Sequence, residues 1–292
     1  MNEKIGKSID WVTTAKTLSE ALPYLKRYES ATIVIKLGGA AMANAESLSA
    51  FARDIVLMKQ CKVNPIIVHG GGPMINDALD KWKIDFDFIE GKRITDDKAI
   101  KVVEMVLSGD VNRTIVSAIN CQGGKGIGLS GKDASLLICE KENPRLGFVG
   151  KPIKTNIGIL SNLVANDFIP VIAPIGTDES GQTFNINADT MAGVISASMS
   201  ADRLLLLTDV KGVQDPNGKV VKEAGPKKIK KLLECKTISG GMIPKVKTAL
   251  DAIEAGVKAV VILDGRVQNA CLLELFTEHG VGTLIRNQCP RI

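Results

Sequence analysis

The sequence predicts an α/β protein built around a mostly parallel sheet. Short, uninterrupted apolar runs alternate along the chain with longer segments of helical periodicity. Apolar strands without alternation are buried on both faces, and strand–helix alternation builds parallel sheets with right-handed crossovers. The length of 292 residues and the apolar fraction of 45% allow a sizeable core and exclude disorder as the main state.

The first expected element is an amphipathic helix over 9–29, which Pro23 should kink. Its apolar side chains recur at steps of four and three residues, at Trp11, Ala15, Leu18, Leu22 and Leu25. The helix precedes the first strand and extends the main body. Two interpretations stay open, packing on its own domain and docking to another subunit. A membrane-surface helix is less favoured because the charges are mixed in sign.

Strands and helices then alternate to the end of the chain. We expect strands at 33–35, 65–68, 136–139, 169–173, 204–207, 259–263 and 283–285. We expect helices at 44–60, from about 73, and at 96–107, 110–120, 155–166, 188–200, 244–255 and 268–279. No internal repeat or low-complexity linker divides the chain.

The composition argues against several classes of protein. The two histidines, His69 and His279, exclude a multi-histidine metal centre, and six cysteines without a CxxC pair disfavour a zinc site. No apolar run approaches the roughly 20 residues of a membrane helix. With no secretory signal, the scattered cysteines indicate a cytoplasmic protein. The net charge of +5 suits an anionic substrate, and few aromatics argue against nucleic acid.

Residues 126–131 carry two nucleotide-binding patterns that we reject. GIGLSG matches G-x-G-x-x-G, and GIGLSGKD begins like a Walker A motif but has Asp133 where that motif needs Ser or Thr. Both motifs need a preceding strand and a following helix, so that phosphate meets free helix amides. Here a helix precedes and a strand-like run follows, so we expect a loop without a dinucleotide or P-loop role.

Four polar or glycine-rich segments lie at predicted strand ends or helix starts, where open α/β sheets bind ligands. They are Lys36-Leu37-Gly38-Gly39, His69-Gly70-Gly71-Gly72-Pro73, the alternating Asn185, Asn187 and Asp189, and Gly240 to Lys245. Tight turns and a helix cap at Asp189 are the structural alternatives. Two lysines beside exposed amides, without an obvious nucleophile or general base, favour phosphoryl transfer, which needs positioning and charge neutralisation.

The motifs KLGGAAM, VHGGGP, GKRIT, GLSGKD, APIG, NINADTMAG, LLLLTDVKGV, GGMIPKV, DGR, LLELF and GVGT occur in this order. Over about 9–286 the chain thereby resembles the N-acetyl-L-glutamate kinases of the amino acid kinase family. The resemblance implies a three-layer αβα sandwich with a mainly parallel central sheet. It also implies an oligomerisation helix (1–29), a lobe that binds the amino-acid substrate (30–184) and a lobe that binds ATP (185–292).

The reaction implied by the resemblance converts ATP and N-acetyl-L-glutamate into ADP and N-acetyl-L-glutamyl 5-phosphate, the second step of arginine biosynthesis. Lys36 and Lys245 would stabilise the transferring phosphoryl group, and Asp189 would organise both lysines. The resemblance assigns N-acetylglutamate to Gly71, Gly72, Arg93 and Asn185, and the nucleotide to Gly38, Gly39, Thr208 and Asp209. Mg²⁺ would arrive with ATP, without a dedicated protein cage.

The helix at 9–29 is similar to that of the arginine-inhibited members, in which such helices interlace dimers into a hexamer, a trimer of dimers. The inhibitor arginine would then bind near Arg203, Glu274, Gly280 and Gly282. Asn269 departs from the His that many members carry in the stretch before LLLE, which leaves arginine inhibition open. A PII signalling protein is a further partner that the sequence leaves open.

Other functions remain as alternatives. Glutamate 5-kinase, aspartokinase, carbamate kinase and UMP kinase belong to the same family, but NINAD and GKRIT favour the acetylated substrate. The sequence also lacks an appended regulatory domain of the aspartokinase type. A catalytically silent arginine sensor is the alternative from another class, and retention of Lys36 and Lys245 argues against it.

Overall fold

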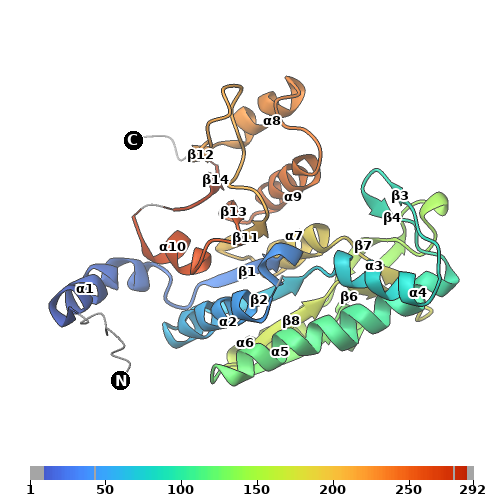
Figure 1. Cartoon of the computed structure of the whole chain (residues 1–292), viewed down its shortest axis with the longest axis horizontal. Coiled ribbons are helices and arrows are strands. Elements are labelled where there is room, and N and C mark those ends of the chain that lie inside the picture. Colours follow the sequence, from blue (N-terminus) through green and yellow to red (C-terminus); the bar gives the residue numbers. More distant parts are fainter. Residues whose placement is uncertain (1–9, 43, 279, 288–292) are drawn as a thin grey trace, which may run out of the picture.

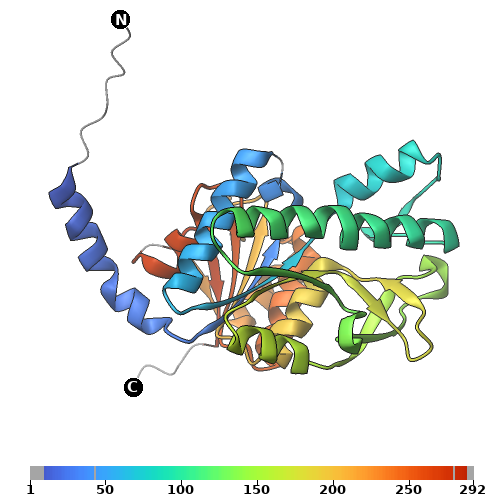
Figure 2. The same ribbon diagram turned by 90° about the horizontal axis from the view of Figure 1, so that it is seen from below.

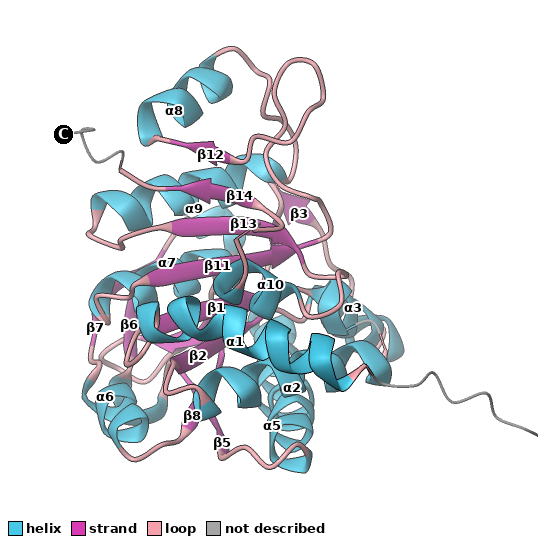
Figure 3. Ribbon diagram, turned by 90° about the vertical axis from the view of Figure 1, so that its left-hand side faces the viewer, coloured by secondary structure: helices cyan, strands magenta, loops and turns pink. Residues whose placement is uncertain are grey.

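An eight-stranded sheet forms the centre of the molecule (Figure 1). The computed structural model describes residues 10–42, 44–278 and 280–287. Neighbouring strands are parallel, except that β13 and β14 are antiparallel. The order is β12 (Glu223–Ala224), β14 (Thr283–Ile285), β13 (Val260–Asp264), β11 (Arg203–Thr208), β1 (Thr32–Leu37), β2 (Asn64–His69), β8 (Ile169–Ala173) and β5 (Gly126–Ser130). Figure 3 shows these strands stacked from β12 to β5, and the expected mainly parallel α/β fold is confirmed.

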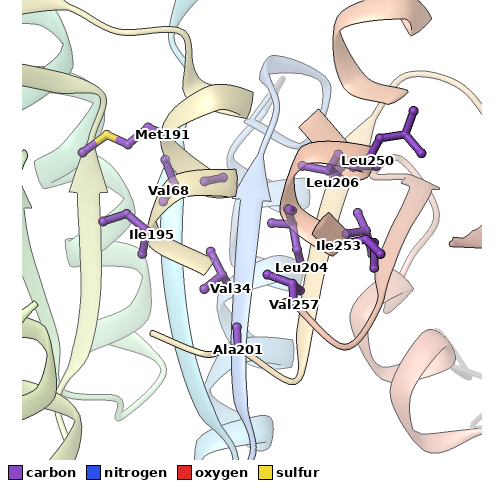
Figure 4. Packing of buried hydrophobic residues seen from close by; sticks show 14 of the residues in the cluster. Val34, Val68, Met191, Ile195, Ala201, Leu204, Leu206, Leu250, Ile253 and Val257 are labelled. Carbon is purple, nitrogen blue, oxygen red and sulfur yellow. The ribbon is translucent and has the colours of Figure 1, made fainter. Parts of the chain in front are cut away.

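Alternate side chains of the central strands enter two hydrophobic clusters, one on each face of the sheet. Val34 and Leu204 belong to the first cluster, which also contains Met191 and Ile195 of α7 (Ala188–Ser198) (Figure 4). Ile33 and Leu205, their chain neighbours, belong to the second. Burial on both faces explains why these strands are uninterrupted apolar runs, which the sequence identifies correctly.

Helices cover both faces and produce the expected αβα layers. The first cluster includes residues of α6 (Gly158–Ala165), α7 (Ala188–Ser198), α8 (Pro226–Glu234) and α9 (Met242–Glu254). The second includes residues of α2 (Ala45–Gln60), α5 (Asn112–Cys121) and α10 (Ala270–Phe276). A third, smaller cluster joins α3 (Gly72–Lys81) to α4 (Asp97–Glu104). The expected helix at 268–279 is shorter because the residue before α10, Asn269, is left-handed (φ 56°).

A second sheet and a hairpin extend the half of the molecule that contains β8. The sheet has the order β10 (Thr183–Asn185), β9 (Ile175–Thr177), β6 (Leu137–Lys141) and β7 (Gly150–Thr155), and the hairpin pairs β3 (Phe88–Ile89) with β4 (Lys92–Arg93). The strand expected at 136–139 lies here and not in the central sheet. The helix expected over 155–166 starts only at Gly158, since β7 occupies the chain up to Thr155.

The expectation of a loop at 126–131 is wrong. Residues 126–130 form β5, the edge strand beside β8. The glycines permit close packing, since a Cβ at Gly128 would lie 2.0 Å from the Asn112 side-chain oxygen. The short 3₁₀ turn Asp133–Ser135 follows β5 instead of an α-helix, so both phosphate motifs lack the helix they need.

The two helices expected at 96–107 and 110–120 form one continuous helix. A π-helical segment, Met105–Val111, links α4 to α5 without a break at Gly109. It places the buried Asn112 side chain against β8, where its amide donates to the carbonyl of Val171 at 2.9 Å. The continuous helix therefore packs α5 along β5 and β8.

The N-terminal helix α1 (Trp11–Arg27) extends away from the sheet (Figure 2). Asp10 caps it by accepting from the amides of Val12 and Thr13, and Pro23 lies inside the helix without ending it. The predicted stripe is largely exposed: Trp11 is 70% exposed and Leu18 69%. No helix within the described residues combines the length and apolar character needed to cross a membrane. The first part of the predicted helical segment, 1–9, lies outside the described residues.

Candidate active site

Two lysines from distant parts of the chain meet one buried carboxylate. Lys36 is the penultimate residue of β1, Asp189 lies in the first turn of α7, and Lys245 lies near the start of α9. The Nζ atom of Lys36 is 2.9 Å from Oδ1 of Asp189, and Nζ of Lys245 is 2.9 Å from Oδ2. Asp189 is 5% exposed and Lys36 9%. The carboxylate thus holds two ammonium groups at one end of the sheet.

The electrostatics of this triad follow from its burial. Burial lowers the pKa of Lys36, and so does the neighbouring Lys245, while Asp189 and Asp209 act in the opposite direction. Burial alone would raise the pKa of Asp189, but the two lysines outweigh it and hold that pKa below its ordinary value. Asp189 is therefore ionised at neutral pH and stabilises two closely spaced positive charges.

Two glycine loops lie next to the triad. β1 and β2 pair in register, with Leu37 opposite His69, so Gly38-Gly39 and Gly70 to Gly72 leave the same sheet edge side by side. A Cβ at Gly38 would lie 2.7 Å from the carbonyl oxygen of Leu207. That space admits only glycine, and backbone amides in such a loop can approach an anion.

A cavity of about 180 Å³ lies beside these loops. Its wall brings together four residues singled out from the sequence, Gly71, Gly72, Arg93 and Asn185. Arg93 is 7% exposed, and its Nη2 donates to the Gly72 carbonyl at 3.4 Å and to the Asn76 side-chain oxygen. Its Nη1 is buried without a hydrogen-bond partner. Burial lowers the pKa of Arg93, and the free donor suits an anionic ligand.

His69 is buried inside the structure and is not exposed to the cavity. Its Nδ1 lies 2.9 Å from the Gly70 carbonyl and its Nε2 3.2 Å from the Asn112 amide. These contacts fit a neutral imidazole that donates through Nδ1 and accepts at Nε2. Burial lowers the pKa of His69 to about 4, which makes it a structural group of the glycine loop. His279 lies outside the described residues.

Thr208 and Asp209 follow β11, the strand beside β1. Thr208 is 5% exposed, and its hydroxyl donates to the Asp209 carboxylate at 3.1 Å. Asp209 is exposed and close enough to attract the Lys36 charge. These residues therefore lie on the opposite side of Lys36 from β2 and the Arg93 cavity.

A separate cavity of about 550 Å³ lies where α1 meets the β12–β14 edge. It is lined by the four residues predicted as an allosteric group, Arg203, Glu274, Gly280 and Gly282, together with Tyr28 and Arg286. Glu274 accepts from the Val281 amide at 3.0 Å, and burial raises the pKa of Glu274. Arg203 lies over the Tyr28 ring at 5.7 Å. The cavity thus contains both charge signs.

Asn187, one of the alternating residues singled out from the sequence, accepts from the amides of Asp189 and Thr190 and so starts α7. The cap of α7 is therefore Asn187 and not Asp189, the alternative that the sequence left open. Two further contributors to the site, Phe86 and Phe88, were not identified from the sequence. Phe86 and Phe88 contact the Arg93 guanidinium, and their spacing of two before GKRIT was the available signal. Within residues 10–42, 44–278 and 280–287, no three His, Cys, Asp or Glu side chains are arranged to hold a metal ion.

Comparisons of the sequence and of the fold with known proteins both find kinases. The sequence profile of the amino acid kinase family matches residues 31–264. The acetylglutamate kinase of Dinoroseobacter shibae is 60% identical over 277 residues, 95% of this chain and 96% of that protein. The fold is similar to carbamate kinase from Giardia lamblia bound to AMP-PNP, with TM-score 0.66, 17% identity and coverage of 89% and 99%. It is also similar to N-acetylglutamate synthase from Neisseria gonorrhoeae, with TM-score 0.85 and 22% identity, where 94% of this chain spans 64% of that protein.

Proposed function

The chain belongs to the amino acid kinase family, and we propose that it transfers the γ-phosphoryl group of ATP to the side-chain carboxylate of N-acetyl-L-glutamate. The product, N-acetyl-L-glutamyl 5-phosphate, is an intermediate of arginine biosynthesis. The observation that carries the proposal is the buried Lys36–Asp189–Lys245 arrangement. The high identity to proteins named acetylglutamate kinase supports the choice of acceptor.

The chemistry needs no general base. A side-chain carboxylate has an ordinary pKa near 4.3, so the acceptor oxygen is already ionised at neutral pH. This oxygen attacks the γ-phosphorus, the bond to the bridging oxygen breaks, and ADP leaves with the electron pair. Lys36 and Lys245 neutralise charge on the phosphoryl and bridging oxygens, while Asp189 keeps both ammonium groups in place. The neutral, buried His69 has no proton-transfer role in this scheme.

The two substrates would approach the lysines from opposite sides. The free Nη1 of Arg93 would bind the carboxylate that does not react, with Asn185, Gly71 and Gly72 around the rest of the molecule. On the other side, Gly38, Gly39, Thr208 and Asp209 would face the nucleotide. Mg²⁺ would enter as part of the ATP complex.

A coupled ADP-release assay with N-acetylglutamate tests the proposal. We expect turnover by the wild type and a loss of kcat on the order of 10²-fold or more in Lys36→Ala and Lys245→Ala, since each removes charge stabilisation. Lys151→Ala is the matched control, because this lysine is 64% exposed and forms an ion pair with Glu140 at 3.2 Å. No turnover by the wild type would refute the kinase proposal, and unchanged kcat in either variant would remove that lysine from it.

We further propose that arginine inhibits the enzyme by binding in the cavity of Arg203 and Glu274. The support is the convergence of the predicted group, with the Glu274 carboxylate suited to a guanidinium or an α-amino group and Arg203 suited to a carboxylate. Glu274→Ala should abolish inhibition by arginine and leave kcat without arginine within about twofold. Equal inhibition of variant and wild type would exclude this site.

The exposed stripe of α1 supports the proposed homohexamer, in which helices of neighbouring dimers interlace. Trp11 and Leu18 would be buried between copies, which removes apolar surface from water. Deletion of residues 1–29 should convert hexamers to dimers and weaken arginine inhibition. Light scattering that still shows a hexamer would refute interlacing through α1.

A further inference from the structure

We propose that Phe86 and Phe88 form an aromatic corner, the pair of rings that positions the Arg93 guanidinium for the non-reacting carboxylate of the substrate. This inference rests on the proposed function and deepens it by adding two positioning residues. The corner is built on the hairpin of β3 and β4. It acts through Arg93 and makes no bond to the reacting atoms.

The geometry of the corner is regular. The Cζ atom of Arg93 lies 4.7 Å from the ring centroid of Phe86 and 4.7 Å from that of Phe88. The two rings are 6.1 Å apart and nearly perpendicular, with an interplanar angle of 85°. Both distances to the guanidinium are within the range in which a cation is attracted to an aromatic face.

The chain builds this corner from local register. Phe88 pairs directly with Arg93 across the β3–β4 hairpin, so their side chains share one face. Phe86 precedes Phe88 by two residues, the spacing that returns an extended chain to the same face. Gly91, with φ of 78°, lies in the turn that reverses the chain between the two strands. The segment 86–93 therefore contains both the two rings and the guanidinium that they contact.

The rings solve a particular problem for Arg93. No described ion pair within residues 10–42, 44–278 and 280–287 involves this buried guanidinium. Asp80 attracts its charge from beyond ion-pair distance and Nη2 donates to two oxygens, and the two rings add to this stabilisation. A carboxylate partner would occupy the N–H donors that a substrate needs. Aromatic faces attract the cation without accepting its in-plane hydrogen bonds, so Nη1 stays free.

The corner therefore links substrate binding to the hairpin. Phe88 is 46% exposed and also lines the cavity, together with the glycines after β2. Without the rings, the hydrogen bonds of Nη2 to Gly72 and Asn76 remain, but the guanidinium is free to turn about them. A bidentate contact with a carboxylate depends on the plane that the rings hold. We expect loss of a ring to weaken binding of a substrate with the second carboxylate and to spare a substrate without it.

The test compares N-acetylglutamate with 4-acetamidobutanoate, which keeps the acceptor carboxylate and lacks the α-carboxylate. Phe88→Leu and Phe86→Leu should raise the KM for N-acetylglutamate roughly tenfold, with kcat and the KM for ATP within about twofold. The kcat/KM for 4-acetamidobutanoate should stay within about twofold. Phe88→Tyr, which keeps the ring, should restore wild-type KM.

Two controls separate positioning from general damage. Trp82→Leu removes an aromatic that is 61% exposed and has no contact with Arg93 among the described ring contacts, and it should leave both substrates unaffected. Adding Phe88→Leu to Arg93→Gln should change KM by less than twofold, because the rings act through Arg93. Equal loss on both substrates, or an unchanged KM in both leucine variants, would overturn the aromatic corner. Absence of wild-type turnover would instead refute the proposed function, and the corner's role with it.

Discussion

Replacing Asp189 by Asn tests whether one carboxylate organises both lysines. At an effective dielectric of 20, each ammonium 2.9 Å from the carboxylate gains about 6 kcal/mol of attraction. Much of this offsets the desolvation of the buried Lys36 and Asp189 and of the half-buried Lys245. Asp189→Asn keeps the shape of the side chain and removes both attractions. The variant leaves two ammonium groups together in a buried site.

Loss of the Asp189 charge should lower both the stability and the activity of the protein. The lowered pKa of Asp189 means that its contribution to stability is complete at pH 7 and is lost only as the pH falls below about 4. At pH 7 the variant should therefore lose about 3 kcal/mol of unfolding free energy. Burial and Lys245 would lower the pKa of Lys36 further without the opposing Asp189. The alkaline limb of the kcat profile should move to lower pH, and kcat should fall about 10²–10³-fold.

The assay is ADP release with saturating N-acetylglutamate and ATP from pH 6 to 9.5, together with urea unfolding at pH 7. Asp251→Asn is the matched control, because it removes an exposed carboxylate from α9, the helix that carries Lys245. A kcat within tenfold of wild type, with the alkaline limb unmoved, would show that the lysines are positioned without Asp189. The reasoning about the triad would then be refuted.

Three further predictions concern stability. Asp54 is 3% exposed, and burial raises its pKa to about 6. Its ionisation therefore destabilises the folded state as the pH rises from about 4 to 6. In urea titrations, Asp54→Asn should raise the unfolding free energy at pH 7 by about 2 kcal/mol and leave it unchanged at pH 3.5. In Asp54→Asn, the unfolding free energy should still fall by about 3 kcal/mol as the pH falls from 6.5 to 4, because the pKa of the buried His69 is lowered to about 4 and His69 stays neutral in the folded state. Adding His69→Asn should remove this pH dependence. If the pH dependence persists, another group causes it. Gly128→Ala should cost about 2 kcal/mol in thermal unfolding, since its Cβ would lie 2.0 Å from the Asn112 oxygen, and an unchanged Tm would show that Asn112 can move.

Most strands of the central sheet could be predicted because a strand that is buried on both faces is an uninterrupted run of apolar residues. Every apolar run from 33–35 to 259–263 that was predicted as a strand is a strand. β5 was missed because its sequence, GIGLS, is half-buried and is shaped by contact with Asn112, which belongs to the preceding helix α5. Helix packing against glycine has no periodic signal along the strand itself.

The residues of the candidate site could also be predicted only in part. Lys36, Asp189 and Lys245 were singled out because each stands at a strand end or helix start, but their meeting depends on three elements from different parts of the chain. The contact of Phe86 and Phe88 with Arg93 could not be predicted, because the alternating Asp-Phe-Asp-Phe run is also typical of an exposed strand. Only the hairpin register shows that both rings face Arg93.

The π-helical segment between α4 and α5 determines which direction the side chains of α5 face. Each residue of a regular helix turns the chain by about 100° and advances it by 1.5 Å. Removing one residue from 105–111 would regularise the hydrogen bonds, yet it would swing Asn112 away from the Val171 carbonyl and from His69. It would also displace Leu107, against which Gly71 packs. Length changes among related chains should therefore accumulate in surface turns and be absent from this segment.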